Sequence, residues 1–178
     1  MKNVGIVRRL DELGRIVIPR EFRKTHRINV GDPLEIMATE TGNIVITKVD
    51  MLSDLTALCE TACQSLSAEL SMTVAGSGFD NLLTASGQGR SSLVDKPLPH
   101  SITKLLKNRG FYNGSVMSDE IAKLPEDIAF GYVCIVPIQS YDDCFGGLFA
   151  FSNKEIAGFD IAAMKLAGRL VGDTLAKY

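Results

Sequence analysis

Cationic side chains are concentrated near the start of the chain, where they could contact a polyanion. Residues 5–27 contain seven arginines or lysines and only three acidic residues. The seven are Arg8, Arg9, Arg15, Arg20, Arg23, Lys24 and Arg27. Six of them are arginine, whose planar guanidinium forms bidentate hydrogen bonds with phosphate oxygens and with guanine. This composition favours contact with nucleic acid.

The last four of these cations, from Arg20 to Arg27, are spaced like one face of a helix. Their offsets of 0, 3, 4 and 7 residues bring like charges side by side, and the repulsion costs roughly a few tenths of a kcal/mol per pair. A phosphate backbone would offset this cost. Alternatively, the helix is exposed to solvent and the acidic residues Asp11, Glu12 and Glu21 reduce the repulsion. Charge alone leaves both interpretations open.

The two parts of the chain have opposite net charge. The whole chain of 178 residues has a formal charge of −2, but residues 1–49 hold nine basic and six acidic residues, a net charge of +3. The remainder therefore carries −5. A change of sign predicts one part built for an anionic partner and another with a different task. We expect two domains, residues 1–50 and residues 51–178.

Short β-branched runs and turn residues predict the order strand, strand, helix, strand, strand in the first domain. The expected strands are 4–9, 15–18, 34–39 and 43–49, and the expected helix is 20–27. So small a unit buries little apolar surface, and this one has no cysteine to staple it. We therefore expect an obligate homodimer.

The second domain is predicted to be α+β, with an antiparallel sheet packed on terminal helices. Apolar residues at helical spacing indicate helices over 51–70 and 155–177. Between them we expect strands at 71–75, 81–86, 131–139 and 145–152, a helix at 101–108, and an irregular stretch to about residue 127.

The first domain resembles a known family through specific motifs. The run GIVRRLDELGRIVIP over 5–19, EFRK over 21–24 and GDPLEI over 31–36 resemble the swapped-hairpin domain of AbrB-type bacterial transition-state regulators. The resemblance implies a β-barrel dimer in which the hairpins of two chains interleave. It also implies regulation of sporulation or transition-state genes in the cytoplasm, on the nucleoid.

The same resemblance implies contacts to double-stranded DNA. They are expected at Arg8, Arg15, Arg23 and Lys24, with Arg9 and Arg20 as helpers. The implied target is A·T-rich, deformable DNA that is read by shape. Few Asn or Gln residues accompany these cations, which fits binding by phosphate contact and groove shape.

The second domain is similar to GAF domains. The similarity rests on Ala85–Gly87, Ser101–Leu106 and the apolar run Gly146–Phe151. It implies that an unknown small molecule could bind between the sheet and its loops, although no nucleotide-binding signature is visible. The resemblance also implies that helices 51–70 and 155–177 bundle between dimers to give a homotetramer, and helix 51–70 is the better candidate because it directly follows the dimeric unit. Alternatively, both helices cover only their own sheet.

The remaining features predict neither an enzyme nor a metal site. Cys59 and Cys63 have a spacing that can chelate a metal, but no second ligand pair matches them, so core packing is expected. No nucleophile–base pair is visible, and we expect no cofactor. No apolar run is long enough to span a membrane, and the start of the chain lacks a signal-peptide core.

Two other functions remain open. AbrB-like domains also occur in antitoxins, which carry a short disordered tail, whereas residues 50–178 here are apolar and well patterned. The chain could also be a small-molecule-binding GAF protein that uses its basic start only to dimerise. Salt-dependent binding to DNA would distinguish these alternatives.

Overall fold

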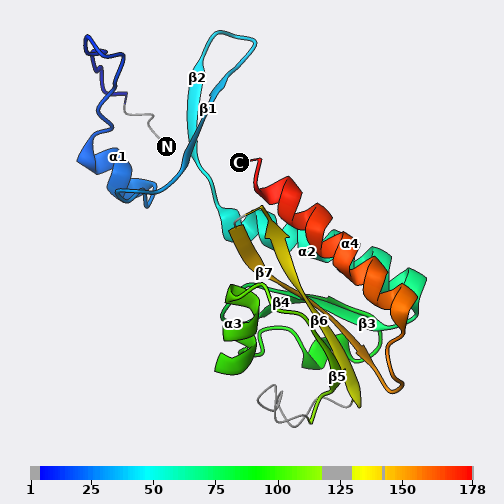
Figure 1. Ribbon diagram of the computed structural model, residues 1–178. Coiled ribbons are helices and arrows are strands. Elements are labelled where there is room, and N and C mark those ends of the chain that lie inside the picture. Colours follow the sequence, from blue (N-terminus) through cyan, green and yellow to red (C-terminus); the bar gives the residue numbers. More distant parts are fainter. Residues whose placement is uncertain (1–4, 118–129, 142, 178) are drawn as a thin grey trace. The chain divides into compact units, whose positions relative to one another are not determined.

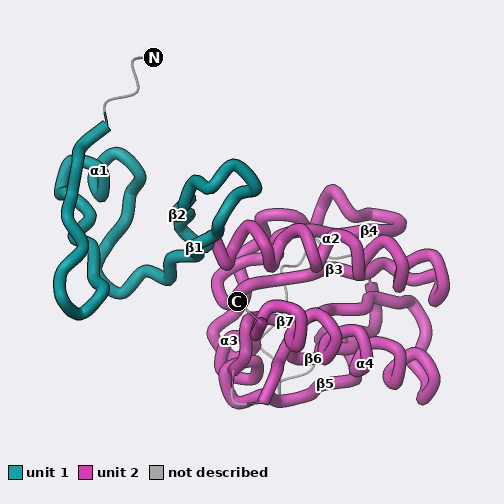
Figure 2. Tube along the Cα trace, turned by 90° about the horizontal axis from the view of Figure 1, so that it is seen from above, with its two compact units in different colours: residues 1–49 teal, residues 50–178 magenta. Residues whose placement is uncertain are grey.

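The chain forms two units, seen in the ribbon of Figure 1 and coloured separately in Figure 2. Unit 1 comprises residues 1–49 and unit 2 comprises residues 50–178. The computed structural model describes residues 5–117, 130–141 and 143–177.

Unit 1 contains one β-hairpin, as predicted. β1 (Leu34–Ala38) pairs antiparallel with β2 (Ile44–Lys48). The turn between them is closed by a hydrogen bond of 2.8 Å from the Thr39 amide to the Asn43 carbonyl. Gly42 takes a φ of +80° in this turn, a conformation that a side chain would disfavour.

The first two predicted strands, 4–9 and 15–18, are not formed in the single chain. Over 5–18 the backbone is extended on both sides of a turn, and the Asp11 amide donates to the Arg15 carbonyl at 3.0 Å. Beyond that bond, the two flanking segments form no ladder in the described part of unit 1. A strand needs a neighbour for its N–H and C=O groups, and the described residues of unit 1 supply none in register.

Unit 2 is built on a five-stranded antiparallel sheet with the order β4-β3-β7-β6-β5. The strands are β3 (Thr73–Ser77), β4 (Leu82–Ser86), β5 (Tyr112–Ser115), β6 (Tyr132–Ser140) and β7 (Asp143–Ser152). The predicted strands all exist, with bounds shifted by up to two residues. β5 falls in the stretch expected to be irregular, of which residues 118–127 lie outside the described residues.

Two long helices, α2 (Met51–Leu70) and α4 (Gly158–Leu175), lie side by side over one face of the sheet (Figure 1). The helix predicted over 51–70 is confirmed at both ends, and the last helix is shorter than the predicted 155–177. The Asp50 side chain accepts a hydrogen bond from the Ser53 amide at 3.3 Å and so caps α2.

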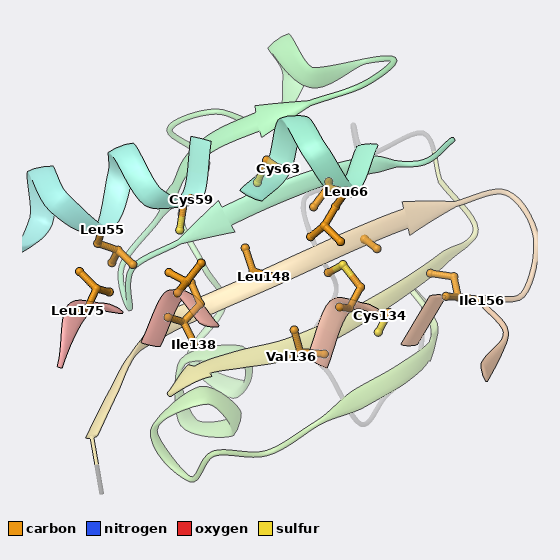
Figure 3. Close-up of a cluster of buried hydrophobic side chains, with 14 residues drawn as sticks. Leu55, Cys59, Cys63, Leu66, Cys134, Val136, Ile138, Leu148, Ile156 and Leu175 are labelled. Carbon is orange, nitrogen blue, oxygen red and sulfur yellow. The ribbon is translucent and has the colours of Figure 1, made fainter. Parts of the chain in front are cut away.

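The side chains between these helices and the sheet form the larger core, shown in Figure 3. Leu55 and Cys59 on α2 belong to this core together with Cys134 on β6 and Leu148 on β7. On the opposite face, α3 (His100–Lys107) and the 3₁₀ turn η1 (Arg90–Ser92) cover a second core. These two layers around one sheet confirm the α+β class expected for this half.

Candidate nucleic-acid interface

The turn between Asp11 and Arg15 holds one arginine in a defined place. Asp11 Oδ1 accepts hydrogen bonds from the Leu13 amide at 3.0 Å and the Arg15 amide at 2.8 Å. Asp11 Oδ2 accepts from Arg15 Nε at 2.7 Å. Gly14, at φ +74°, provides the left-handed residue that the turn requires.

These bonds lower the pKa of Asp11 below its usual value of 3.8. The largest cause is the hydrogen bond from the Arg15 backbone, and the bond from the Arg15 side chain comes next. The carboxylate is therefore ionised at neutral pH, and Arg15 remains exposed at the tip of the turn.

α1 (Arg20–Thr25) carries three of the predicted DNA-contacting residues: Arg20, Arg23 and Lys24. The helix ends two residues earlier than predicted, because Arg27 takes a left-handed φ of +53°. The Ile28 amide donates to Arg23 at 2.8 Å and the Arg27 amide to Lys24 at 3.3 Å, a Schellman ending. The expectation that all four cations lie on one helical face is therefore wrong for Arg27.

The four cations nevertheless come together. Arg20, Arg23, Lys24 and Arg27 line one hollow of about 420 Å³ in unit 1. Arg23 is half-buried, and its Nε has no hydrogen-bond partner in the part of the chain that the structure describes. The Arg23 guanidinium is thus held with donor capacity unused. Arg27 was not among the residues predicted to contact DNA. Its spacing from Arg20 and Arg23 could have indicated it, but its position beyond the end of the helix could not.

Arg8 and Arg9 lie outside this group. Both are exposed, and Arg8 is the one charged residue that lines a hollow of about 390 Å³ made otherwise of apolar side chains. The lining includes Val7, Ile16 and Phe22. The structure therefore divides the six predicted residues into a turn site at Arg15, a helix group at Arg20, Arg23 and Lys24, and an extended segment with Arg8 and Arg9.

Unit 1 exposes an unusual amount of apolar surface. None of residues 5–49 is buried, and twelve large apolar side chains of this unit are exposed. Val7 is 92% exposed and Val30 is 93% exposed. Single exposed apolar residues are common on soluble proteins, but a large apolar surface marks a site of association.

Three of the four cysteines of unit 2 lie in its core, as was expected for Cys59 and Cys63. Cys59, Cys63 and Cys134 are buried, and no cluster of three or more metal-ligating residues occurs within the described ranges. Burial raises the pKa of Cys59 to about 12 and the pKa of Cys134 to about 11, so both remain thiols at neutral pH. No helix in the described chain is long and apolar enough to cross a membrane.

Polar hollows of unit 2 bear on the expected small molecule. One of about 310 Å³ is lined by Ser67, Thr73, Gln88, Asn153 and further residues, including Phe130 and Phe151. Between α3 and the sheet, Ile102, Leu106, Phe149 and others are fully buried against one another. Small-molecule binding stays a prediction.

Comparisons with known proteins find relatives for both parts of the chain. Residues 7–53 match the family described as antidote-toxin recognition MazE, bacterial antitoxin. Stage V sporulation protein T of Bacillus subtilis is 30% identical over 164 residues, which cover 89% of each chain. The transition state regulatory protein AbrB of the same organism is 61% identical over 36 residues, covering 20% of this chain and 38% of AbrB.

Solved GAF domains share the fold of unit 2. The GAF domain of the Acinetobacter phosphoenolpyruvate-protein phosphotransferase superposes with a TM-score of 0.55 at 11% identity, covering 72% of this chain and 95% of its own. The Thermosynechococcus elongatus PixJ GAF domain gives 0.57 at 17% identity, covering 73% and 89%. A free methionine-R-sulfoxide reductase of Thermoplasma acidophilum gives 0.55 at 13% identity, covering 72% and 97%. At these identities the likeness shows the fold alone.

A cationic hairpin unit followed by a GAF-like domain defines a class of protein, the DNA-binding transcription regulators of the AbrB type. The long match to stage V sporulation protein T covers both units. The chain therefore belongs to the family of AbrB-type regulators that includes stage V sporulation protein T.

Proposed function

We propose that the chain regulates sporulation or transition-state genes by binding double-stranded DNA through the cations of unit 1. The observation that carries this proposal is the hollow lined by Arg20, Arg23, Lys24 and Arg27. Four cations around one depression repel each other, and phosphate groups would offset that repulsion. Such a regulator acts in the cytoplasm, on the nucleoid.

The DNA-binding form is proposed to be a dimer with interleaved hairpins. The extended segments around Arg8 and Arg15 have no strand partner among the residues that the structure describes, and the hollow beside them is lined by apolar side chains such as Val7, Ile16 and Ile46. A second copy of the chain would supply strands that pair with these extended segments, and it would cover the exposed apolar side chains. It would also double the number of cations facing the duplex.

Two such dimers are proposed to associate through unit 2. On α4, Phe159, Leu166 and Leu170 are exposed and face away from the core of their own unit. Pairing of these surfaces in a homotetramer would gain avidity on spaced DNA sites. The GAF-like fold also leaves room for sensing of a small molecule, for which the polar hollow at Ser67 and Thr73 is the candidate.

The test is a salt titration of the full chain with a fluorescent A·T-rich duplex and a G·C-rich duplex of about three helical turns. The logarithm of affinity is expected to fall with the logarithm of salt concentration, with a slope near −0.9 per neutralised phosphate. Lys24→Ala should reduce the slope by about one unit. Lys154→Ala, an exposed cation of unit 2, is the matched control and should leave it unchanged. A flat salt response would refute the proposal.

The match of residues 7–53 to an antitoxin family favours one second candidate, an autoregulating antitoxin. An antitoxin would bind a toxin through a segment outside the DNA-binding domain. The described residues of unit 2 instead form a packed α+β core. Deletion of the gene for this chain should therefore leave growth unchanged. If the chain were an antitoxin, the same deletion would stop growth as long as the gene for its toxin remained.

A further inference from the structure

The ion pair between Asp11 and Arg15 is unusual because it puts a negative charge inside the proposed DNA-binding surface. Asp11 Oδ2 lies 2.7 Å from Arg15 Nε, and both side chains are largely exposed, 41% and 71% respectively. A carboxylate in this position repels phosphate. Judged by charge alone, Asp11 weakens the function proposed for unit 1.

Stability does not explain the pair either. Exposed ion pairs contribute little to stability because water screens them. The backbone of the turn is held by Asp11 Oδ1, which accepts from the amides of Leu13 and Arg15. Asp11 Oδ2 does not bind the backbone of the turn; it accepts a hydrogen bond from the Arg15 side chain.

The pair uses only one edge of the guanidinium. Nε is bound to Asp11, while neither Nη group of Arg15 has a hydrogen bond within residues 5–49 as described. The two Nη groups form the end of the fork that recognises phosphate or guanine in a bidentate manner. Asp11 thus restricts the rotamers of Arg15 and leaves its recognition edge unused.

On the basis of the DNA-binding function proposed above, we propose that Asp11 is a positioning residue that presents the Arg15 guanidinium to the duplex. A free arginine loses its rotamer freedom on binding, at a cost of about 0.5–1.5 kcal/mol for such a side chain. Arg15 has lost part of this freedom already in the unbound protein. The gain exceeds the repulsion between Asp11 and the phosphates.

This proposal and simple electrostatics predict opposite signs for one substitution. Asp11→Asn keeps an oxygen for the amides of Leu13 and Arg15 but replaces the acceptor of Arg15 Nε and removes a negative charge. If Asp11 acts only through its charge, the variant binds DNA more tightly. If Asp11 positions Arg15, the variant binds about twofold to tenfold more weakly, the range that corresponds to the rotamer cost.

Glu12→Gln is the matched control. Glu12 is the exposed neighbour of Asp11 in the same turn, and the described structure gives its carboxylate no hydrogen bond or ion pair. Removing that charge should tighten binding. Equal behaviour of the Glu12→Gln and Asp11→Asn variants would overturn the proposal.

A double-mutant cycle separates positioning from general effects on the turn. In the Arg15→Ala background no guanidinium is left to position, so Asp11→Asn should tighten binding just as Glu12→Gln does. A loss of affinity that persists in this background would show that Asp11 acts only on the backbone. Circular dichroism and sedimentation confirm that each variant keeps the fold and oligomer of the unmodified chain.

A measurement on the unmodified chain keeps the test independent of mutants and of DNA. In the free protein, the Nε–H NMR signal of Arg15 should exchange with water more slowly than that of Arg9, which is exposed and makes no described ion pair. Equal exchange would overturn the proposal. Slow exchange in a protein that binds no duplex would instead refute the DNA-binding function and leave the ion pair standing.

Discussion

The side chain of Lys48, the last residue of β2, is hydrogen-bonded to Arg27, the left-handed residue just beyond the end of α1. Lys48 Nζ donates to the Arg27 carbonyl at 2.9 Å and forms an ion pair with Asp32 Oδ2 at 2.7 Å. Asp32 also accepts a hydrogen bond from the Asn29 amide at 2.7 Å. Through these bonds the hairpin supports the loop that carries the last cation of the proposed DNA-binding surface.

The ion pair should be visible as a shifted titration of Asp32. The hydrogen bond from Lys48 is the largest cause that lowers the pKa of Asp32 below 3.8. Because the folded pKa is lowered, the stabilisation is present above pH 3.8 and is lost as the pH falls through the folded value. Lys48→Met should therefore raise the pKa of Asp32, measured by carboxyl ¹³C NMR. Lys107→Met, in unit 2, should leave it unchanged; an unshifted Asp32 in the Lys48 variant would show that the pair is absent in solution.

Replacing Arg27 by glycine should stabilise the end of α1 and weaken DNA binding. It occupies a left-handed conformation that costs an ordinary residue about 1–2 kcal/mol and costs glycine almost nothing. Arg27→Gly should therefore slow hydrogen exchange of the Ile28 amide, which bonds to Arg23 in the helix ending. It should also weaken DNA binding and reduce the salt slope by about one unit.

Arg27→Lys is the control for this experiment, since it keeps both the charge and the strained backbone. Its salt slope and its exchange rate should match those of the unmodified chain. If the Arg27→Gly variant bound DNA with an unchanged slope, Arg27 would not contact phosphate.

Two glycines of α4 should be intolerant of any side chain. A Cβ at Gly168 would lie 2.7 Å from the Pro137 carbonyl oxygen, and one at Gly172 would overlap the backbone of Gln139. These contacts allow α4 to approach β6 closely. Gly172→Ala should lower the free energy of unfolding by about 1–3 kcal/mol in denaturant titrations, the usual cost of overpacking.

Gly158→Ala supplies the comparison within the same helix. Gly158 is the first residue of α4, and a Cβ there meets nothing within 4 Å. This substitution should be neutral or slightly stabilising, since alanine favours helix more than glycine does. Equal effects at both glycines would mean that α4 does not lie against β6 as described.

The exposed apolar residues of α4 should govern assembly. Phe159 is 81%, Leu166 62% and Leu170 59% exposed. Replacement of both leucines by serine should convert the proposed tetramer into dimers in analytical ultracentrifugation while unit 2 keeps its circular dichroism. Lys177→Ser, at an exposed position just past α4, should leave the tetramer intact. Persistence of the tetramer in the double variant would place the contact elsewhere.

Local sequence patterns predicted the elements that have a strong periodicity of their own. The stripe containing Leu55, Cys59, Cys63 and Leu66 predicted α2 at its observed bounds because each of these residues returns to the same buried face. The apolar runs of β6 and β7 were equally clear, since both strands lie in the middle of a sheet covered on two sides.

Other elements depend on partners that a local pattern does not reveal. β5, with the sequence Tyr-Asn-Gly-Ser over 112–115, has no apolar alternation and exists because it pairs with β6. The segments on either side of the Asp11–Arg15 turn have strong β-branched patterns and yet form no strand in one chain. Strand propensity becomes a strand only where a neighbour accepts its hydrogen bonds.

The sequence by itself determined the family, the charge division and the list of cations, because these are properties of residue type and order. Only the tertiary structure decided how the cations are grouped. A left-handed Arg27 ends α1 and still joins Arg23 at one hollow, and a tight turn brings the Asp11 carboxylate onto Arg15. Both groupings follow from backbone angles at single residues, and side-chain identity alone does not specify those angles.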